Sequence, residues 1–113
     1  MSLSEIAAGA ADLIARARAG QATPDDLSGG TFTITNLGMF DVDAFTPIIN
    51  VPECAILGVG RIKERAVVRD GQIVVRPTVV LSLTIDHRAI DGAPAARFLQ
   101  RLKQLIEEPL LAL

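Results

Sequence analysis

His87 is the one histidine of the chain, and it stands between two acidic residues in the segment Asp86 to Gly92. An imidazole changes protonation near neutral pH, so it can serve as a general base, and a nearby carboxylate can hold it in place. A turn supported by rigid elements fixes such a side chain without burying it. We therefore take His87 as the first candidate for chemistry, although most isolated turn histidines are structural and Asp-Gly is also an ordinary turn signal.

The residues on either side of this segment predict a strand followed by a helix. Before it, alternate positions are apolar, which is typical of a strand with one buried face: Val79, Leu81, Leu83 and Ile85. After it, apolar residues recur at steps of three and four, as on one stripe of a helix: Ala95, Phe98, Leu99, Leu102, Leu105 and Ile106. We expect Pro77 to open the strand and His87 to stand in the strand-to-helix turn.

Other groups with chemical potential are few. Cys54 is a competing nucleophile, because thiols attack thioesters, but its apolar neighbours predict a buried and sluggish thiol. With one histidine and one cysteine the chain offers no zinc site of the usual ligands, so we expect no metal. Gly58 and Gly60 lack the third glycine of a dinucleotide motif and instead indicate close backbone approach.

Composition excludes several classes of protein. The 113 residues are half hydrophobic, yet no apolar run reaches the length of a membrane span, so no membrane partner is expected. A net charge of -2 and 4% aromatic residues do not suit nucleic acid. A single cysteine cannot form an internal disulfide, which places the protein in the cytoplasm or an equivalent reducing compartment. So much apolar surface on a small chain favours an oligomer.

The N-terminal part predicts a helix and a strand. An apolar stripe from Leu3 to Ala17 indicates an amphipathic helix, with Ser4 as a possible cap and Gly20 as its end. Turn residues from Pro24 to Gly30 lead to a strand, Thr31 to Asn36, which we expect to bury its Phe and Ile and to present a threonine face.

The middle of the chain predicts further strands. Leu37 to Val42 indicates a loop, Phe45 to Asn50 a strand-like segment, and Cys54 to Gly60 a buried strand. Asp70-Gly71 suits a tight hairpin. No repeat or linker divides the chain, so we expect one domain. The order of its elements, a helix, several strands and a helix, predicts the α/β class. We expect a two-layer sandwich of a mixed β-sheet with helices on one side.

The motifs also resemble a known family. HRAIDG fits the HxxxDG motif of acyltransferases of the chloramphenicol acetyltransferase-like superfamily. Three ordered blocks resemble the dihydrolipoyl acyltransferase component of 2-oxoacid dehydrogenase complexes: GGTFTITNLGMF, FTPIINVPECAILGVG and DHRAIDGAPAARFL. The family's catalytic domain is longer, and its N-terminal half has no counterpart here. The resemblance therefore implies that residues 1–113 are the C-terminal part of that catalytic domain.

This resemblance implies an enzyme that moves an acyl group between dihydrolipoamide and coenzyme A. His87 would be the general base, Thr35 would donate its hydroxyl to the oxyanion, and Asp91 would hold the loop and orient the base. On residue type alone, Asp91 fits a turn former or helix cap equally well, the threonine face of the strand fits a solvated surface, and Arg88 fits a structural salt bridge with Asp86 or with an interface carboxylate. Coenzyme A and the lipoyl group would be substrates, and the residues that bind them stay unassigned.

The resemblance also implies partners. Family members are homotrimers that assemble into larger cages, with the histidine of one subunit facing the hydroxyl of its neighbour. A hydrophobic C-terminal segment joins trimers, and the leucines from Leu110 to Leu113 would fill that role. The decarboxylating dehydrogenase and dihydrolipoyl dehydrogenase would be further partners, in the bacterial cytoplasm or the mitochondrial matrix. NLGMF looks most like the pyruvate, or acetyl, type. The alternatives are an inactive oligomeric scaffold and an acyltransferase with a different acceptor.

Overall fold

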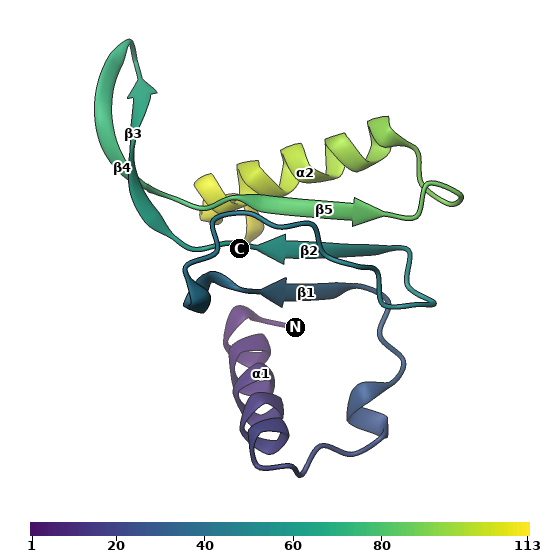
Figure 1. Ribbon diagram of the computed structural model, residues 1–113. Helices are drawn as coiled ribbons and strands as arrows, with labels where there is room; N and C mark the ends of the chain where they lie inside the picture. The colour runs from purple at the N-terminus through teal and green to yellow at the C-terminus, as the bar shows by residue number, and fades with distance from the viewer. The chain divides into compact units, whose positions relative to one another are not determined.

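The computed structural model describes all 113 residues, which form two compact units, residues 1–30 and residues 31–113. The first unit holds helix α1 (Leu3–Arg18) and a 3-10 turn, η1 (Asp25–Leu27). The second holds all the strands, helix α2 (Gly92–Glu107) and two more 3-10 turns, η2 (Gly38–Phe40) and η3 (Pro109–Ala112). Figure 1 labels the helices and strands. None of these helices combines the length and the apolar character that crossing a membrane requires.

Helix α1 begins with a cap at Ser2, so the predicted cap at Ser4 is wrong. The Ser2 hydroxyl accepts a hydrogen bond from the Glu5 amide at 3.2 Å, and the Glu5 carboxylate accepts one from the Ser2 amide at 2.5 Å. This reciprocal cap needs a Glu three residues after the Ser, which only Ser2 has. The hydrogen bond from the Ser2 backbone also lowers the pKa of Glu5. Gly20, at φ 70°, follows the end of the helix, as predicted.

The main sheet has three strands in the order β1 (Thr33–Asn36), β2 (Ala55–Val59) and β5 (Leu81–Ile85). β1 runs parallel to β2 and β5 antiparallel to it, which confirms the predicted mixed sheet. Because β2 has a partner on each edge, it supplies the core, and the buried hydrophobic residues of the chain are its own Ala55, Ile56 and Leu57. The predicted buried strand is therefore confirmed.

The two faces of this sheet differ in chemistry. Ile34, Leu57 and Leu83 form one cross-strand row, and the next row, on the opposite face, is formed by Thr35, Gly58 and Ser82. Helix α2 lies on the apolar face, because the rings of Phe32 and Phe98 have centroids 5.8 Å apart. The opposite face is rich in hydroxyl groups.

The expectation that the strand from Thr31 to Asn36 buries its Phe and Ile is wrong for the chain taken alone. Ile34 is 67% exposed and Phe32 is 39% exposed, whereas Thr33 and Thr35 are half-buried. Helix α2 packs along β5, at the far edge of the sheet from β1 (Figure 1), so the apolar face of β1 receives little cover. Alternation along the strand was predicted correctly, but not which face is covered.

The predicted strand at residues 45–50 is absent, because this segment is irregular. Pro47 has no amide hydrogen for a ladder, and it is buried. The segment instead crosses the hydroxyl-rich face of the sheet, where the ring of Phe45 lies over Gly58, within 3.0 Å of the place where a Cβ would stand. Gly60 lies still closer to another chain segment, since a Cβ there would be 2.0 Å from the Asp43 carbonyl oxygen. The close approach predicted for these two glycines is confirmed.

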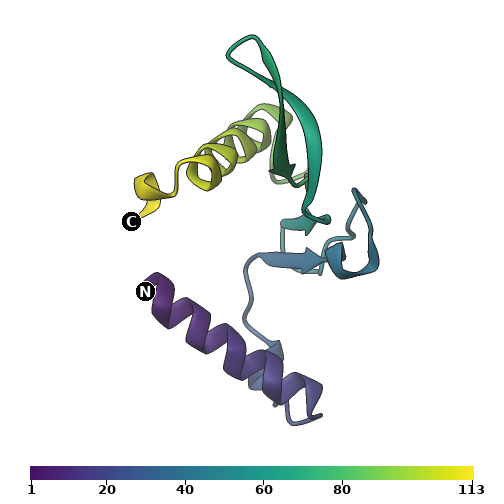
Figure 2. The same cartoon turned by 90° about the vertical axis from the view of Figure 1, so that its left-hand side faces the viewer.

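The second sheet is a hairpin of β3 (Lys63–Arg69) and β4 (Gln72–Thr78). Asp70 and Gly71 both have positive φ, 50° and 75°, as a tight two-residue hairpin turn requires. Pro77 lies within β4, opposite Glu64, so it does not open the strand that leads to His87. Each strand of a two-stranded hairpin has a free edge that tolerates the missing amide hydrogen of Pro. Figures 1 and 2 show the hairpin extending past the end of the main sheet where β5 begins.

Candidate active site

His87 stands in the turn between β5 and α2, as predicted. The Asp86 amide donates to the Cys54 carbonyl at 2.8 Å, which continues the pairing of β2 and β5 beyond the end of β5. The amides of Ala89 and Ile90 both donate to the Asp86 carbonyl at 3.0 Å, so the turn closes back on Asp86. The His87 side chain is exposed, and a reactant can therefore reach its imidazole.

Asp86 and Arg88 form the charged pair of this turn. The Arg88 amide and Nε both donate to Asp86 Oδ1 at 3.0 Å, and Nη2 donates to Oδ2 at 2.7 Å. The predicted pairing of Arg88 with Asp86 is thus confirmed. The Arg88 guanidinium, followed by its backbone amide, lowers the pKa of Asp86 to about 2. Asp86 is therefore a carboxylate at neutral pH, and it acts as a fixed hydrogen-bond acceptor and not as a proton carrier.

Asp91 occupies the position just before α2, with the extended backbone of an N-cap (φ -81°, ψ 161°). Its side chain makes no capping hydrogen bond. The sequence left open whether Asp91 caps the helix or orients His87. The backbone conformation is that of a cap, but the hydrogen bond that would make the side chain a cap is not formed.

Thr35 lies near the end of β1, on the hydroxyl-rich face. It is level with Gly58 and Ser82 in the register, and its side chain is half-buried. Thr33, on the same face, donates its hydroxyl to Glu53 Oε2 at 2.5 Å. Thr35 is thus placed differently from a freely solvated surface threonine, in a row where the two neighbours across the sheet are small.

Thr35 and His87 lie toward opposite ends of the sheet within one chain. Thr35 is level with Ser82, whereas His87 comes after Ile85, the last residue of β5. At about 3.3 Å per residue, the strand from Ser82 to Ile85 alone spans about 10 Å. One chain therefore does not bring the two side chains to the same small reacting group, and a joint site needs a second subunit.

Cys54 is exposed, so the prediction of a buried thiol is wrong. It lies just before β2, where the strand begins, and only the residues that follow it are enclosed by both neighbouring strands. Its carbonyl accepts the hydrogen bond from Asp86, which places Cys54 at the base of the His87 turn. A thioester can consequently reach the Cys54 thiol, so exposure does not argue against the competing thiol mechanism.

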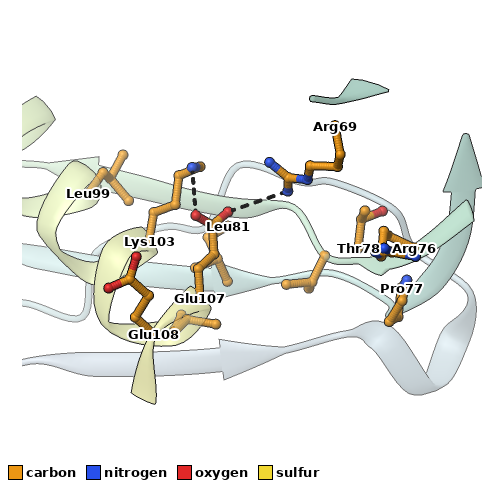
Figure 3. A pocket seen from close by; sticks show the side chains of 11 residues that line it. Arg69, Arg76, Pro77, Thr78, Leu81, Leu99, Lys103, Glu107 and Glu108 are labelled. Carbon is orange, nitrogen blue, oxygen red and sulfur yellow. Dashed lines mark hydrogen bonds and ion pairs between the residues drawn. The ribbon is translucent and has the colours of Figure 1, made fainter. Parts of the chain in front are cut away.

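One pocket of the chain lies away from these residues. It has a volume of about 710 Å³ and lies between the hairpin, the start of β5 and the end of α2. Glu107 is among the residues that line it, and Figure 3 shows its ion pairs with Lys103 and Arg69. Lys103 Nζ lies 3.0 Å and Arg69 Nη2 3.9 Å from the Glu107 carboxylate. None of His87, Thr35 and Asp91 lines it. No group of three or more His, Cys, Asp or Glu residues could hold a metal ion.

Sequence reasoning missed a charge cluster around Asp43. Asp43 accepts hydrogen bonds from Arg61 Nε at 2.5 Å and Lys63 Nζ at 3.1 Å, and Arg65 Nη2 lies 3.5 Å away. Arg61, ahead of Lys63, lowers the pKa of Asp43. The signal was present, because basic residues at alternate positions share one face of a strand. The cluster ties the segment before Phe45 to the start of β3.

A mixed sheet, a helix along one face and an HxxxDG turn between them define the chloramphenicol acetyltransferase-like α/β fold. Residues 1–113 match the family model of the 2-oxoacid dehydrogenases acyltransferase (catalytic domain). The chain belongs to this family.

Two curated relatives illustrate the similarity. The chain is 50% identical over 109 residues to a probable dihydrolipoyllysine-residue succinyltransferase component of the mitochondrial 2-oxoglutarate dehydrogenase complex of Schizosaccharomyces pombe, covering 96% of this chain and 24% of the relative. It is 50% identical over 101 residues to the dihydrolipoyllysine-residue acetyltransferase component of the pyruvate dehydrogenase complex of Bacillus subtilis, covering 89% of this chain and 23% of the relative. The chain thus spans about a quarter of their length.

The chain is also similar to solved structures of this family. One concerns the role of a serine, a histidine and an asparagine in the catalytic mechanism of Azotobacter vinelandii dihydrolipoamide acetyltransferase, and another is the cubic core of the pyruvate dehydrogenase multienzyme complex. Each has a TM-score of 0.86 and 46% identity, and each match covers 93% of this chain and 43% of the solved chain.

Proposed function

We propose that residues 1–113 are the C-terminal part of an acyltransferase catalytic domain, and that this domain transfers an acyl group between dihydrolipoamide and coenzyme A. The observation that carries the proposal is the exposed His87, held in the β5–α2 turn within the family's HxxxDG motif. The chain's relatives include both acetyltransferase and succinyltransferase components, which supports acyl transfer in general.

The chemistry follows from His87 and Thr35. The imidazole of His87 takes the proton from the thiol of one substrate, and the thiolate attacks the thioester carbonyl of the other. The Thr35 hydroxyl donates a hydrogen bond to the resulting oxyanion, which carries more charge than the ground-state carbonyl. Collapse of the tetrahedral intermediate breaks the original carbon–sulfur bond, and the departing thiolate recovers the proton from His87. No acyl-enzyme is needed.

Residue spacing in the Azotobacter vinelandii enzyme supports these roles. There the serine precedes the histidine by 52 residues and the asparagine follows it by four, which are the separations of Thr35 and Asp91 from His87. Thr35 keeps the hydroxyl of the serine. Asp91 replaces an amide with a carboxylate, so it can still accept a hydrogen bond but carries a charge.

The site is proposed to form between subunits, with His87 of one chain facing Thr35 of its neighbour. The separation of the two residues along the sheet supports this arrangement, as does the cubic core formed by the similar pyruvate dehydrogenase chain. Many large apolar side chains are exposed, among them Leu110 and Leu113 of the C-terminal segment, at 83% and 80%. We therefore propose a trimer that assembles into a cage.

We further propose acetyl as the acyl group, because Asn36 to Phe40 resembles the pyruvate type. The partners would then be the decarboxylating dehydrogenase and dihydrolipoyl dehydrogenase, in the bacterial cytoplasm or the mitochondrial matrix. Transfer rates with acetyl-CoA and succinyl-CoA as donors to dihydrolipoamide test this proposal. A higher kcat/KM for succinyl-CoA would contradict it.

His87→Ala in the intact protein tests the central proposal. Loss of the general base is expected to lower kcat by roughly 100- to 10,000-fold with the fold unchanged. A variant that keeps more than about a tenth of the wild-type rate would exclude His87 as the base. Calorimetric titration with coenzyme A addresses the alternative, since an inactive scaffold would show no binding even at millimolar ligand.

A further inference from the structure

The hydrogen bonds that shape the His87 turn converge on Asp86. Its amide holds the turn to β2 through Cys54, and its carbonyl accepts from the two amides that bring the chain back toward α2. Its Oδ1 accepts from the Arg88 amide at 3.0 Å. This last bond closes a small ring around His87, of the kind that Asp and Asn side chains form with the amide two residues on.

The ring matters because His87 has an exposed side chain, which packing against its own chain cannot orient. The direction of the Cα–Cβ bond, from which the imidazole projects, is then set by the backbone of residue 87. That backbone lies between the Asp86 carboxylate and the Arg88 amide that the carboxylate binds. The structure assigns Asp86 as a positioning residue for His87, acting through the hydrogen bond from its side chain to the Arg88 amide. This inference rests on the proposed role of His87 as the base.

The ion pair with Arg88 is a secondary part of this arrangement. The Arg88 side chain is 91% exposed and that of Asp86 is 23% exposed, and an ion pair so open to water contributes little by itself. Its effect is to hold the ionised carboxylate against the backbone of the turn, where a charged acceptor forms a stronger hydrogen bond than a neutral one. Asn at position 86 retains the acceptor oxygen without the charge. Ala retains neither.

Three variants of the intact protein separate these contributions. Asp86→Ala removes both the ring and the ion pair, Asp86→Asn keeps the ring but removes the negative charge of the ion pair, and Arg88→Ala removes the ion pair while keeping the backbone amide that closes the ring. A misplaced base is expected to lower kcat by about 10- to 100-fold in Asp86→Ala, with KM for both substrates changed less than about threefold. Asp86→Asn and Arg88→Ala are expected to stay within about fivefold of wild-type kcat.

Hydrogen exchange gives a readout that does not depend on activity. The peptide that contains residues 86–91 should exchange faster in Asp86→Ala than in Arg88→Ala, because only the former loses the acceptor of the Arg88 amide. Equal exchange in these two variants would overturn the ring. Retained wild-type kcat in Asp86→Ala would overturn the positioning role, and so would an Arg88→Ala variant as impaired as Asp86→Ala.

If Asp86→Ala does not fold, the kcat of Asp86→Asn tests the positioning role instead. A kcat of Asp86→Asn within about fivefold of the wild type supports the ring. An Asp86→Asn variant as slow as His87→Ala overturns it. His87→Ala is measured in the same series, and its outcome is independent of the exchange experiment. High activity of His87→Ala would refute the base, while unchanged exchange in Asp86→Ala would refute only the ring.

Discussion

The ring of Phe45 lies over Gly58, so close that a Cβ on the glycine would stand 3.0 Å from a ring carbon. Gly58→Ala should therefore lower the free energy of unfolding by roughly 1–3 kcal/mol, the usual cost of overpacking a filled site. Urea denaturation measures this change. The second substitution Phe45→Leu should recover part of the loss, because it gives the new methyl group room.

Gly9→Ala is the matched control for this prediction. Nothing lies within 4 Å of a Cβ at Gly9, which is in the middle of α1. Ala is the better helix former by about 0.5–1 kcal/mol, so this variant should be more stable than the wild type. Equal effects at Gly9 and Gly58 would mean that the Phe45 contact does not restrict the sheet.

Thr35→Ala should lower kcat by roughly 100- to 1,000-fold with KM nearly unchanged, since the hydroxyl stabilises charge that develops only in the transition state. Thr35→Ser should be mild because it keeps the donor. Steady-state kinetics with both substrates distinguish these outcomes. An effect of Thr35→Ala chiefly on KM would assign Thr35 to substrate binding instead.

Cys54→Ala should leave acyl transfer largely intact, because the proposed mechanism passes the acyl group directly between two substrate thiols. The exposure of Cys54 makes this a stringent test, since the thiol is accessible beside the His87 turn. The decisive measurement is kcat alongside the melting temperature. A folded but inactive Cys54→Ala variant would establish a covalent thiol mechanism.

Asp26 should make the first unit sensitive to acid. Its carboxylate accepts hydrogen bonds from the Arg16 guanidinium and, at 2.9 Å, from the Thr23 amide. Arg16 is the larger cause of a folded-state pKa lowered from 3.8 to about 2. Because folding favours the charged form, this stabilisation is present above the unfolded pKa and is lost as pH falls from about 4 to about 2.

Chemical denaturation of wild type and Asp26→Asn as a function of pH tests this linkage. The two proteins should differ in stability at neutral pH and converge in acid. Asp25→Asn removes a neighbouring charge while Arg16 keeps its partner, so it serves as the control. A difference between wild type and Asp26→Asn that does not shrink in acid would contradict the ion pair.

Local patterns predicted most of the secondary structure. The hairpin at Asp70-Gly71, the strand before His87 and the stripe of α2 were readable because turn chemistry and period depend on neighbouring residues. The strand predicted at residues 45–50 failed for a non-local reason, since that segment packs Phe45 onto Gly58 instead of pairing. Which face of β1 is covered depended on where α2 lies, and periodicity along one strand carries no such information.

Some features of the candidate site could likewise be predicted from local sequence, and others could not. His87 could be located from the change of period around it, and the pairing of Arg88 with Asp86 from their proximity in sequence. The exposure of Cys54 could not be predicted, because it depends on the point at which β2 begins. The convergence of hydrogen bonds on Asp86 was also beyond reach, because three backbone amides donate to it, those of Arg88, Ala89 and Ile90, and a list of residue types does not give the direction of backbone groups.

The separation of Thr35 from His87 along the sheet has a genetic consequence. If each site takes one residue from each of two chains, two inactive proteins, His87→Ala and Thr35→Ala, carry their defects in different halves of the site. Co-expression should then produce some contacts in which an intact His87 meets an intact Thr35. Random mixing of equal amounts would restore about a quarter of the contacts in a closed symmetric ring. The two alleles would complement each other, because activity would depend on pairs of neighbouring chains and not on either chain alone.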